Sequence, residues 1–354
     1  MAIKPKGGGA ALLPLFFLSA CVAYERPPRM EFALGTVCVV SLFDCGTDAL
    51  YSDIFSRIRE IDQTMTAFPT LVGGGLVSSV VEIGRQAGIE PVRVGADLID
   101  VLERARYFAE MSDGAFDPTI GPLTRLWGIG THTQRVPDYG EIAAALDLVN
   151  WRDLVIDREA GTVFLRRQGM SLDLGSIAKG YAGDEVARIA REGGVRHALI
   201  DLGGNIVVVG RRARTNEPWR IGMRNPLEGR GTHIGVVEVY DTSIVTSGIS
   251  ERFFEVLALD GTVRRYHHLF STVDGFPVNN GLLSVTIITE SSTDADALST
   301  VAFAMGYERG RALIDSRPGT EAIFVFDDLG VRITDGLAEI FSITNDEFTL
   351  APLE

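Results

Sequence analysis

The sequence predicts a single α+β domain behind a short N-terminal leader. The chain has 354 residues, 46% of them hydrophobic and 23% charged, which is enough for one large core. Its strand-like and helix-like segments are grouped rather than strictly alternating, and no internal repeat or obvious linker follows residue 30. One α+β domain over residues 31–354 is therefore the simplest interpretation.

Residues 1–20 are predicted to be a signal peptide. Lys4 and Lys6 precede an apolar run, 10–18, that is too short to cross a bilayer. The small residues before Cys21 resemble the lipobox of bacterial lipoproteins, in which the cysteine becomes the lipid-modified first residue. We expect a lipid anchor on Cys21, a tether over 21–30 and an inner-membrane lipoprotein that faces the periplasm. A signal peptide without lipidation and a membrane anchor are the alternatives.

Hydrophobic periodicity predicts the elements in order. β-branched and apolar residues over 35–43 indicate a strand, and apolar residues at helical spacing over 47–65 indicate a helix. Glycines 73–75 and the turn formers of 112–119 indicate loops. The same patterns predict a hairpin over 154–165, helices over 96–111, 176–192, 294–305 and 308–315, and strands over 198–200, 206–209, 219–223, 235–240, 254–259, 283–289 and 322–326.

The charge of the chain restricts its partners. The net charge is −14, and it becomes −16 without residues 1–20, which hold two lysines and no acids. Such a surface repels phosphate backbones, so we expect no nucleic-acid partner. A phosphorylated ligand would need local compensation from a metal ion, backbone N–H groups or a few cations. Lys179 is the only lysine beyond residue 20, which suggests a place where a compact ammonium is preferred to a guanidinium.

The two cysteines that follow Cys21 do not predict a disulfide between them or a zinc site. Cys38 and Cys45 are an odd number of residues apart, so on a straight strand they would face opposite sides. No CxxC motif and no Cys/His cluster of zinc spacing occurs.

Residues 171–181 join a predicted strand to a predicted helix through small residues. This junction exposes backbone N–H groups at a helix N-terminus, where anions bind. Asp173 supplies an acceptor there and Lys179 a cation. No Gly-Lys-Ser/Thr sequence occurs, which excludes a Walker loop.

Two further groups of residues are candidates for chemistry. Asp296 and Thr300 are four positions apart, so on a helix both oxygens lie on one face, where they suit Mg²⁺; an ordinary capped helix start is the alternative. His267 and His268 follow a predicted strand, and because adjacent strand residues face opposite ways, at most one of them enters a common site.

The motifs together resemble those of a known family. DLGSIAKGYAGD at 173–184 is similar to the DLGGIAKGYAVD signature of the ApbE family, the FAD:protein FMN transferases. The resemblance covers essentially all of the chain after residue 30. Its other motifs are LGT (34–36), SDGAFDPTIGPLTRLWG (112–128), ALIDLGGNIVVVG (198–210), WRIGMRNP (219–226), TSG (246–248), YHHLFSTVDGFPV (266–278) and SVTIITESSTDADALST (284–300).

The resemblance implies a fold, a cofactor and site residues. The fold would be a single T-fold-like domain with FAD in a central cleft. Mg²⁺ would be held by the backbone carbonyl of Ser176 and by Asp296 and Thr300, with Ser299 as a helper. His268 matches the histidine needed for transfer. The residues expected to contact FAD are Leu34, Phe68, Ala115, Phe116, Asp117, Asp173, Lys179 and Phe270.

The resemblance also implies an activity. The enzyme would split FAD, attach FMN to a threonine or serine hydroxyl of a target flavoprotein, such as a subunit of a membrane redox pump, and release AMP. His268 is the candidate base and Phe68 could stack on the flavin. An FAD pyrophosphatase that yields FMN and AMP, and a non-catalytic FAD-binding lipoprotein, are the alternatives. The absence of GxSxG excludes a typical serine hydrolase.

Three positions depart from the family pattern. Ser271 and Thr272 replace the usual Asp-Pro after the histidine motif, Gly84 stands near a usual Asn, and Leu34 replaces a common Met. These departures bear on the flavin contacts and on the balance between hydrolysis and transfer.

Overall fold

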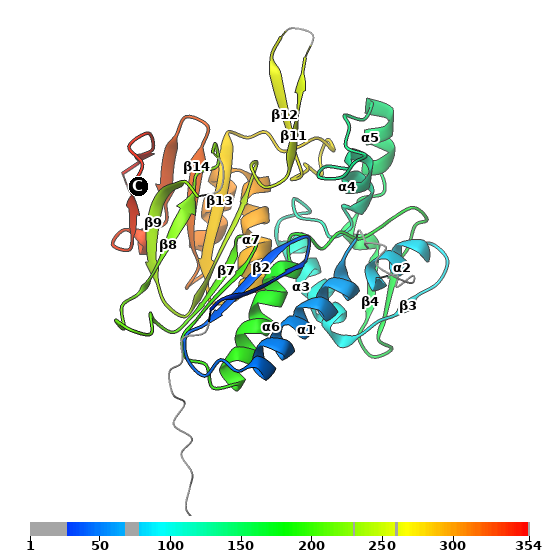
Figure 1. Cartoon of the computed structure of the whole chain (residues 1–354). Coiled ribbons are helices and arrows are strands. Elements are labelled where there is room, and N and C mark those ends of the chain that lie inside the picture. The colour runs from blue at the N-terminus through cyan, green and yellow to red at the C-terminus, as the bar shows by residue number, and fades with distance from the viewer. Residues whose placement is uncertain (1–26, 68–77, 229–230, 259–260, 353–354) are drawn as a thin grey trace, which may run out of the picture.

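The computed structural model describes residues 27–67, 78–228, 231–258 and 261–352 (Figure 1). The predicted signal peptide, Cys21, Phe68 and the glycine run 73–75 lie outside these residues, so the expectations for them stay predictions. Within these ranges, no helix has both the length and the apolar character needed to span a membrane.

The described elements begin with a strand and end with one. The helices are α1 (Asp48–Met65), α2 (Ser79–Arg85), α3 (Ala96–Met111), α4 (Gly121–Trp127), α5 (Tyr139–Leu146), α6 (Ala178–Glu192), α7 (Ser292–Met305) and α8 (Tyr307–Asp315), with 3₁₀ turns η1 (Trp151–Asp153) and η2 (Asp335–Leu337). The strands are β1 (Arg29–Ala33), β2 (Thr36–Leu42), β3 (Val92–Arg93), β4 (Leu154–Asp157), β5 (Thr162–Leu165), β6 (Ala198–Leu202), β7 (Asn205–Val209), β8 (Trp219–Arg224), β9 (His233–Val239), β10 (Thr242–Gly248), β11 (Phe253–Leu257), β12 (Val263–His267), β13 (Leu282–Thr289), β14 (Glu321–Phe326), β15 (Gly330–Ile333), β16 (Phe341–Ile343) and β17 (Thr349–Leu350).

A nine-stranded sheet forms the centre of the molecule, in the order β1-β2-β6-β7-β10-β13-β14-β15-β17. Every neighbouring pair in it is antiparallel except β15 and β17. Helices α1, α6 and α7 cover one face, and β8 and β9 lie over the other (Figure 1). The predicted α+β class is confirmed, because the strands pair antiparallel and the helices lie outside the sheet.

Both faces of the sheet are buried, and β14 shows how. Ala322 and Phe324 pack into the core shared with the helices. Ile323 and Val325 point the other way, into a second core with β8, β9 and β16. Alternate residues of a strand face opposite sides, so a sheet covered on both sides needs apolar residues at nearly every position. This explains why the central strands read as continuous apolar runs in the sequence.

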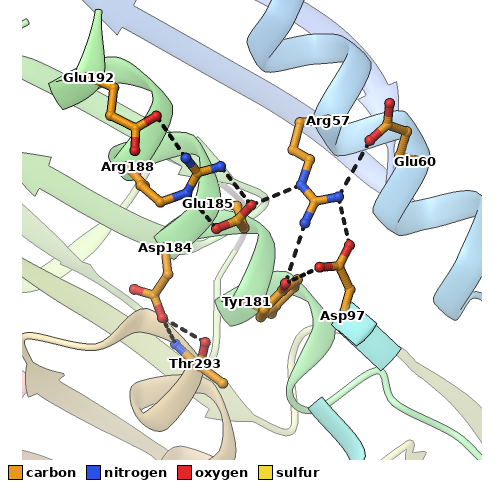
Figure 2. Close-up of polar contacts among 9 residues, drawn as sticks. All are labelled: Arg57, Glu60, Asp97, Tyr181, Asp184, Glu185, Arg188, Glu192 and Thr293. Carbon is orange, nitrogen blue, oxygen red and sulfur yellow. Dashed lines mark hydrogen bonds and ion pairs between the residues drawn. The ribbon is translucent and has the colours of Figure 1, made fainter. Parts of the chain in front are cut away.

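Helix α6 is fixed to its neighbours by a polar network (Figure 2). Arg57 of α1 pairs through Nη1 with Asp97 of α3 at 2.7 Å and through Nε with Glu185 of α6 at 2.9 Å. The Tyr181 hydroxyl donates to Asp97 at 2.9 Å. The bond from Arg57 holds the pKa of Asp97 below its usual value. These contacts join α1, α3 and α6 within the first two turns after Lys179.

Two glycines of α6 allow α7 to approach its backbone. A Cβ at Gly180 would lie 2.2 Å from the carbonyl oxygen of Ser292, and one at Gly183 would lie 2.7 Å from the Ser292 hydroxyl. Only glycine fits such spacing without moving a helix. The signature motif therefore contains glycines for a packing reason that its sequence alone does not reveal.

The structure confirms most of the predicted elements and corrects several bounds. The long helices begin and end within about two residues of prediction, and residues 154–165 form the β4–β5 hairpin. Helix α6 begins at Ala178 instead of Ser176, and β1 begins inside the stretch predicted as a tether. Sequence patterns missed the central strand β10 and the shorter elements α2, α4, α5, β3, β12, β15, β16 and β17. Cys38 is a buried free thiol, so the predicted absence of a Cys38–Cys45 disulfide is confirmed.

Candidate functional site

One cavity brings together most of the predicted site residues. It lies between the start of α6, one face of α7 and the segment that follows β12. Leu34 does not line it, and Phe68 lies outside the described residues. The predicted residues in its wall are Ala115, Phe116, Asp117, Asp173, Ser176, Lys179, His268, Phe270, Asp296 and Thr300.

A second, wider groove borders this cavity. It shares Ala115 and Thr272 with the cavity, but its walls contain none of the predicted metal ligands and not His268. The Thr272 hydroxyl donates to the carbonyl of Gly114 at 2.8 Å, which joins the two walls at this point. We therefore place the chemistry in the smaller cavity.

The turn before α6 is held by its own polar groups. The N–H of Gly175 donates to Asp173 Oδ1 at 2.9 Å, and the N–H of Asp173 donates to the carbonyl of Pro118 at 2.9 Å. Lys179 Nζ donates to the carbonyl of Gly175 at 3.1 Å. The ammonium therefore bends back to the start of its helix, where the helix dipole already favours an anion.

Asp296 joins α7 to the start of α6. The residue is 2% exposed, and its carboxylate accepts from the N–H of Gly180 at 2.9 Å and lies 3.3 Å from Lys179 Nζ. One turn later on α7, the hydroxyl of Thr300 lies 3.0 Å from that of Ser247 on β10. As predicted, Asp296 and Thr300 share one face of a helix and both line the cavity.

Asp184 makes the reciprocal contact from α6 to the start of α7 (Figure 2). Its carboxylate accepts from the N–H of Ser292 at 2.7 Å and from the N–H of Thr293 at 2.9 Å. These N–H groups have no partner within their own helix, so a carboxylate from another element stabilises them. Each of the two helices thus supplies an aspartate to the N-terminus of the other.

The cavity wall contains oxygen donors that suit a hard cation. Ser176 lies in the wall beside Asp296 and Thr300, so that a carbonyl, a carboxylate and a hydroxyl are available. Mg²⁺ takes such oxygens and completes its shell with water or phosphate. Among the described residues, no group of three or more His, Cys, Asp or Glu side chains is arranged to hold a metal ion.

Asp117 is engaged by the protein itself. Oδ1 accepts from the N–H and the hydroxyl of Thr119, both at 2.7 Å, and Oδ2 accepts from the N–H of Trp151 at 2.9 Å. Burial raises the pKa of Asp117, while these three bonds act against that rise. Its carboxylate holds the 115–119 loop in place, and its predicted contact with FAD stays a prediction.

The two histidines separate as their alternation predicts. His267 is buried, with Nε2 2.9 Å from the carbonyl of Val278. His268 lines the cavity and keeps a quarter of its side chain exposed. Desolvation inside the cavity, assisted by Arg252 and His267, lowers the pKa of His268 to about 3, so its imidazole is neutral at physiological pH.

The polar side chains of the wall that sequence reasoning did not assign to the site include Thr124, Ser247, Glu251 and Arg252. Ser247 lies in the quoted TSG motif and Thr124 in the quoted motif at 112–128, so these motifs gave a signal for both. Glu251 and Arg252 lie between two strands, and their place in the site depends on how β11 pairs with β12.

The departures from the family pattern have local roles in the turn after β12. The Ser271 hydroxyl accepts from the N–H of Val273 at 3.2 Å, and the Thr272 hydroxyl bonds to Gly114. Gly84 lies in α2 and does not line the cavity. Leu34 has a positive φ of 54°, and a Cβ on the adjoining Gly35 would lie 3.1 Å from Arg252 Nη2, so this turn lies close to a residue of the cavity wall.

The fold and site define an α+β protein whose cavity suits a phosphorylated ligand and a hard divalent cation. The sequence profile of the ApbE family matches residues 34–324. The chain belongs to the ApbE family.

Relatives and solved structures agree with this assignment. A FAD:protein FMN transferase of Treponema pallidum (strain Nichols) is 36% identical over 339 residues, covering 91% of this chain and 90% of that protein. One of Klebsiella pneumoniae (strain 342) is 37% identical over 278 residues, covering 78% and 82%. The ApbE protein of Thermotoga maritima superposes with a TM-score of 0.77 at 30% identity, covering 89% of this chain and 98% of that one. The flavin transferase ApbE of Vibrio cholerae superposes with a TM-score of 0.73 at 26% identity, covering 89% and 95%.

Replacing Asp184 with alanine should loosen both helix starts. We expect a loss of about 0.5–2 kcal/mol in the free energy of unfolding, the usual cost of a lost N-terminal cap. Amide hydrogen exchange should become faster at 292 and 293 and, because α7 carries Asp296, also at Gly180. Asp138→Ala is the matched control, since Asp138 caps α5. It should reduce stability similarly without changing exchange at Gly180, and unchanged exchange at Gly180 in Asp184→Ala would contradict the coupling.

The His268 ring should not titrate near neutrality. Because its pKa lies at about 3 instead of the usual 6.5, its ring resonances should stay constant from about pH 8 to pH 5. NMR spectra of the ¹⁵N-histidine-labelled protein without metal, assigned with His268→Gln, measure this directly. A titration midpoint near 6.5 would show that the ring is solvated.

Proposed function

We propose that this chain is a Mg²⁺-dependent FAD:protein FMN transferase that attaches the FMN half of FAD to a threonine or serine hydroxyl of a target flavoprotein and releases AMP. The relatives that carry this name support the reaction. The observation that supports it most strongly in this chain is that a helix start, Lys179, Asp296, Thr300 and His268 surround one cavity.

The acidic chain handles the diphosphate by local compensation. The N-terminus of α6 and the ammonium of Lys179 offer positive charge at one side of the cavity. Asp296, Thr300 and the carbonyl of Ser176 would hold Mg²⁺ at the other. When bound, the ion would neutralise charge on the diphosphate and make the phosphorus more electrophilic.

The imidazole of His268 is neutral and lines the cavity, which makes it the candidate base, and its lowered pKa means that the imidazolium needs a stabilising partner. The acceptor hydroxyl oxygen would form a bond to the phosphorus of the FMN half while its proton moves to His268. The bond from that phosphorus to the bridging oxygen breaks, and AMP leaves with the electron pair. Donors at the start of α6 and Lys179 would hold the phosphate oxygens as their charge redistributes. The products are a phosphoester-linked FMN and AMP, so atoms and charge balance.

Two readouts of one incubation test this proposal. The purified protein is mixed with FAD, Mg²⁺ and a flavoprotein subunit that contains a candidate threonine. Intact-mass spectrometry of the subunit reports added FMN, and chromatography reports AMP. We expect both in equal amounts. AMP without added mass would indicate a pyrophosphatase, and neither product would contradict an enzymatic function.

Asp296→Asn should abolish the reaction while leaving the fold intact. Asparagine keeps an acceptor for the N–H of Gly180 but loses the charge that a metal ligand needs, so we expect the rate to fall more than about a hundredfold. Asp294→Asn is the matched control, because Asp294 lies on the same helix, pairs with Arg104 and does not line the cavity. AMP release at the normal rate by Asp296→Asn would show that the metal assignment is wrong.

We also propose that the enzyme acts as a periplasmic lipoprotein on a subunit of a membrane redox pump. The support is the lipobox-like sequence before Cys21. Mass spectrometry of the N-terminal peptide, from protein extracted from bacterial membranes, should show cleavage before Cys21 and a diacylglyceryl group on it. Cys21→Ser should prevent both changes, and a wild-type protein that retains residues 1–20 would contradict the proposal.

A further inference from the structure

The imidazole of His268 is oriented by the backbone of Arg252. The carbonyl oxygen of Arg252 lies 3.2 Å from the backbone N–H of His268 and 3.3 Å from its Nδ1. A carbonyl oxygen only accepts hydrogen bonds, so this contact assigns the proton of the neutral ring to Nδ1. Nε2 therefore carries the lone pair.

A carboxylate faces that lone pair. Glu251 Oε2 lies 3.9 Å from His268 Nε2, and both side chains line the cavity with about a quarter to a third of their surface exposed. This distance is too long for a hydrogen bond, so Glu251 does not occupy the lone pair. Nε2 remains available to an incoming hydroxyl, while the charge of the carboxylate still acts on the ring.

The pairing of β11 and β12 explains why these residues meet. Phe253 is the partner of His267 across the antiparallel hairpin. The residue before β11 therefore lies beside the residue after β12, which places Arg252 against His268. Glu251 precedes Arg252 and lies at the base of the same hairpin, which projects from the rest of the molecule (Figure 1).

We propose that Glu251 is a positioning residue for the transfer, which stabilises the imidazolium that forms when His268 Nε2 takes the proton of the acceptor hydroxyl. This role rests on the proposed function. Before proton transfer, the carboxylate and the Nε2 lone pair attract each other little. The attraction develops only as the ring gains its proton, and an interaction that appears only then accelerates the reaction.

The surroundings of His268 destabilise its imidazolium, so a nearby negative charge is needed to stabilise it. Burial, the charge of Arg252 and the neighbouring His267 all lower its pKa and so disfavour the imidazolium. Desolvation in the cavity raises the pKa of Glu251 and the charge of Asp296 adds to that rise, whereas Lys179, Arg252 and Arg224 lower the pKa. The carboxylate of Glu251, 3.9 Å from Nε2, opposes this destabilisation.

A double-mutant cycle tests the role. Glu251→Gln keeps the shape of the side chain and removes its charge. Loss of one part of general-base catalysis should lower kcat for FMN transfer by about ten- to hundredfold, with the Kd for FAD changed less than about twofold. In a His268→Ala background, where the imidazolium cannot form, Glu251→Gln should change the remaining rate less than about twofold.

Two further variants complete the design. Glu251→Asp restores the charge and should recover part of the kcat that Glu251→Gln loses. Glu255→Gln is the matched control, because Glu255 lies on the same hairpin and pairs with Arg265. It should leave kcat unchanged within about twofold, the margin expected for an exposed pair.

Three results would overturn the role. The first is a normal kcat in Glu251→Gln. The second is a full effect of Glu251→Gln in the His268→Ala background. The third is a loss of kcat in Glu251→Gln that is matched by an equal loss of FAD affinity. If the wild-type protein itself transfers no FMN, the proposed function is refuted, and this role is refuted with it.

Discussion

The N-termini of α6 and α7 each bond to an aspartate of the other helix. Asp184 of α6 accepts from two N–H groups at the start of α7, and Asp296 of α7 accepts from the N–H of Gly180. The helices can do this only because Gly180 and Gly183 let their backbones come close. Any side chain at these two positions would prevent this close approach of the helices. The two glycines therefore set the distance between Lys179 and Asp296.

The remaining site depends on this contact. The cavity lies where α6 begins, and Ser247 of the central sheet fixes Thr300 on the far side of Asp296. The network around Arg57 holds α6 against α1 and α3, so the helix start cannot shift alone (Figure 2). A protein with a net charge of −14 can bind a diphosphate when its few favourable groups are held this rigidly.

Much of the site could be predicted from the sequence because its key residues lie in local patterns. The spacing of Asp296 and Thr300 on a helix, and the opposite faces of His267 and His268, follow from backbone geometry alone. Glu251 could not be found this way, because its place beside His268 depends on the register of β11 and β12. Similarly, Asp184 gives no local sign of a cap, since the N–H groups that it satisfies are more than a hundred residues away. Short elements such as α4 were missed because Gly121 and Pro122 resemble turn residues.

We propose that one divalent ion and the start of α6 hold a dinucleotide diphosphate between them. Crystals of the protein grown with FAD and Mn²⁺ test this most directly, because manganese gives an anomalous signal that identifies its position. We expect one strong peak bounded by Asp296, Thr300 and the carbonyl of Ser176, with the diphosphate between it and Lys179. A peak elsewhere, or FAD bound with no metal between α6 and α7, would contradict the proposal.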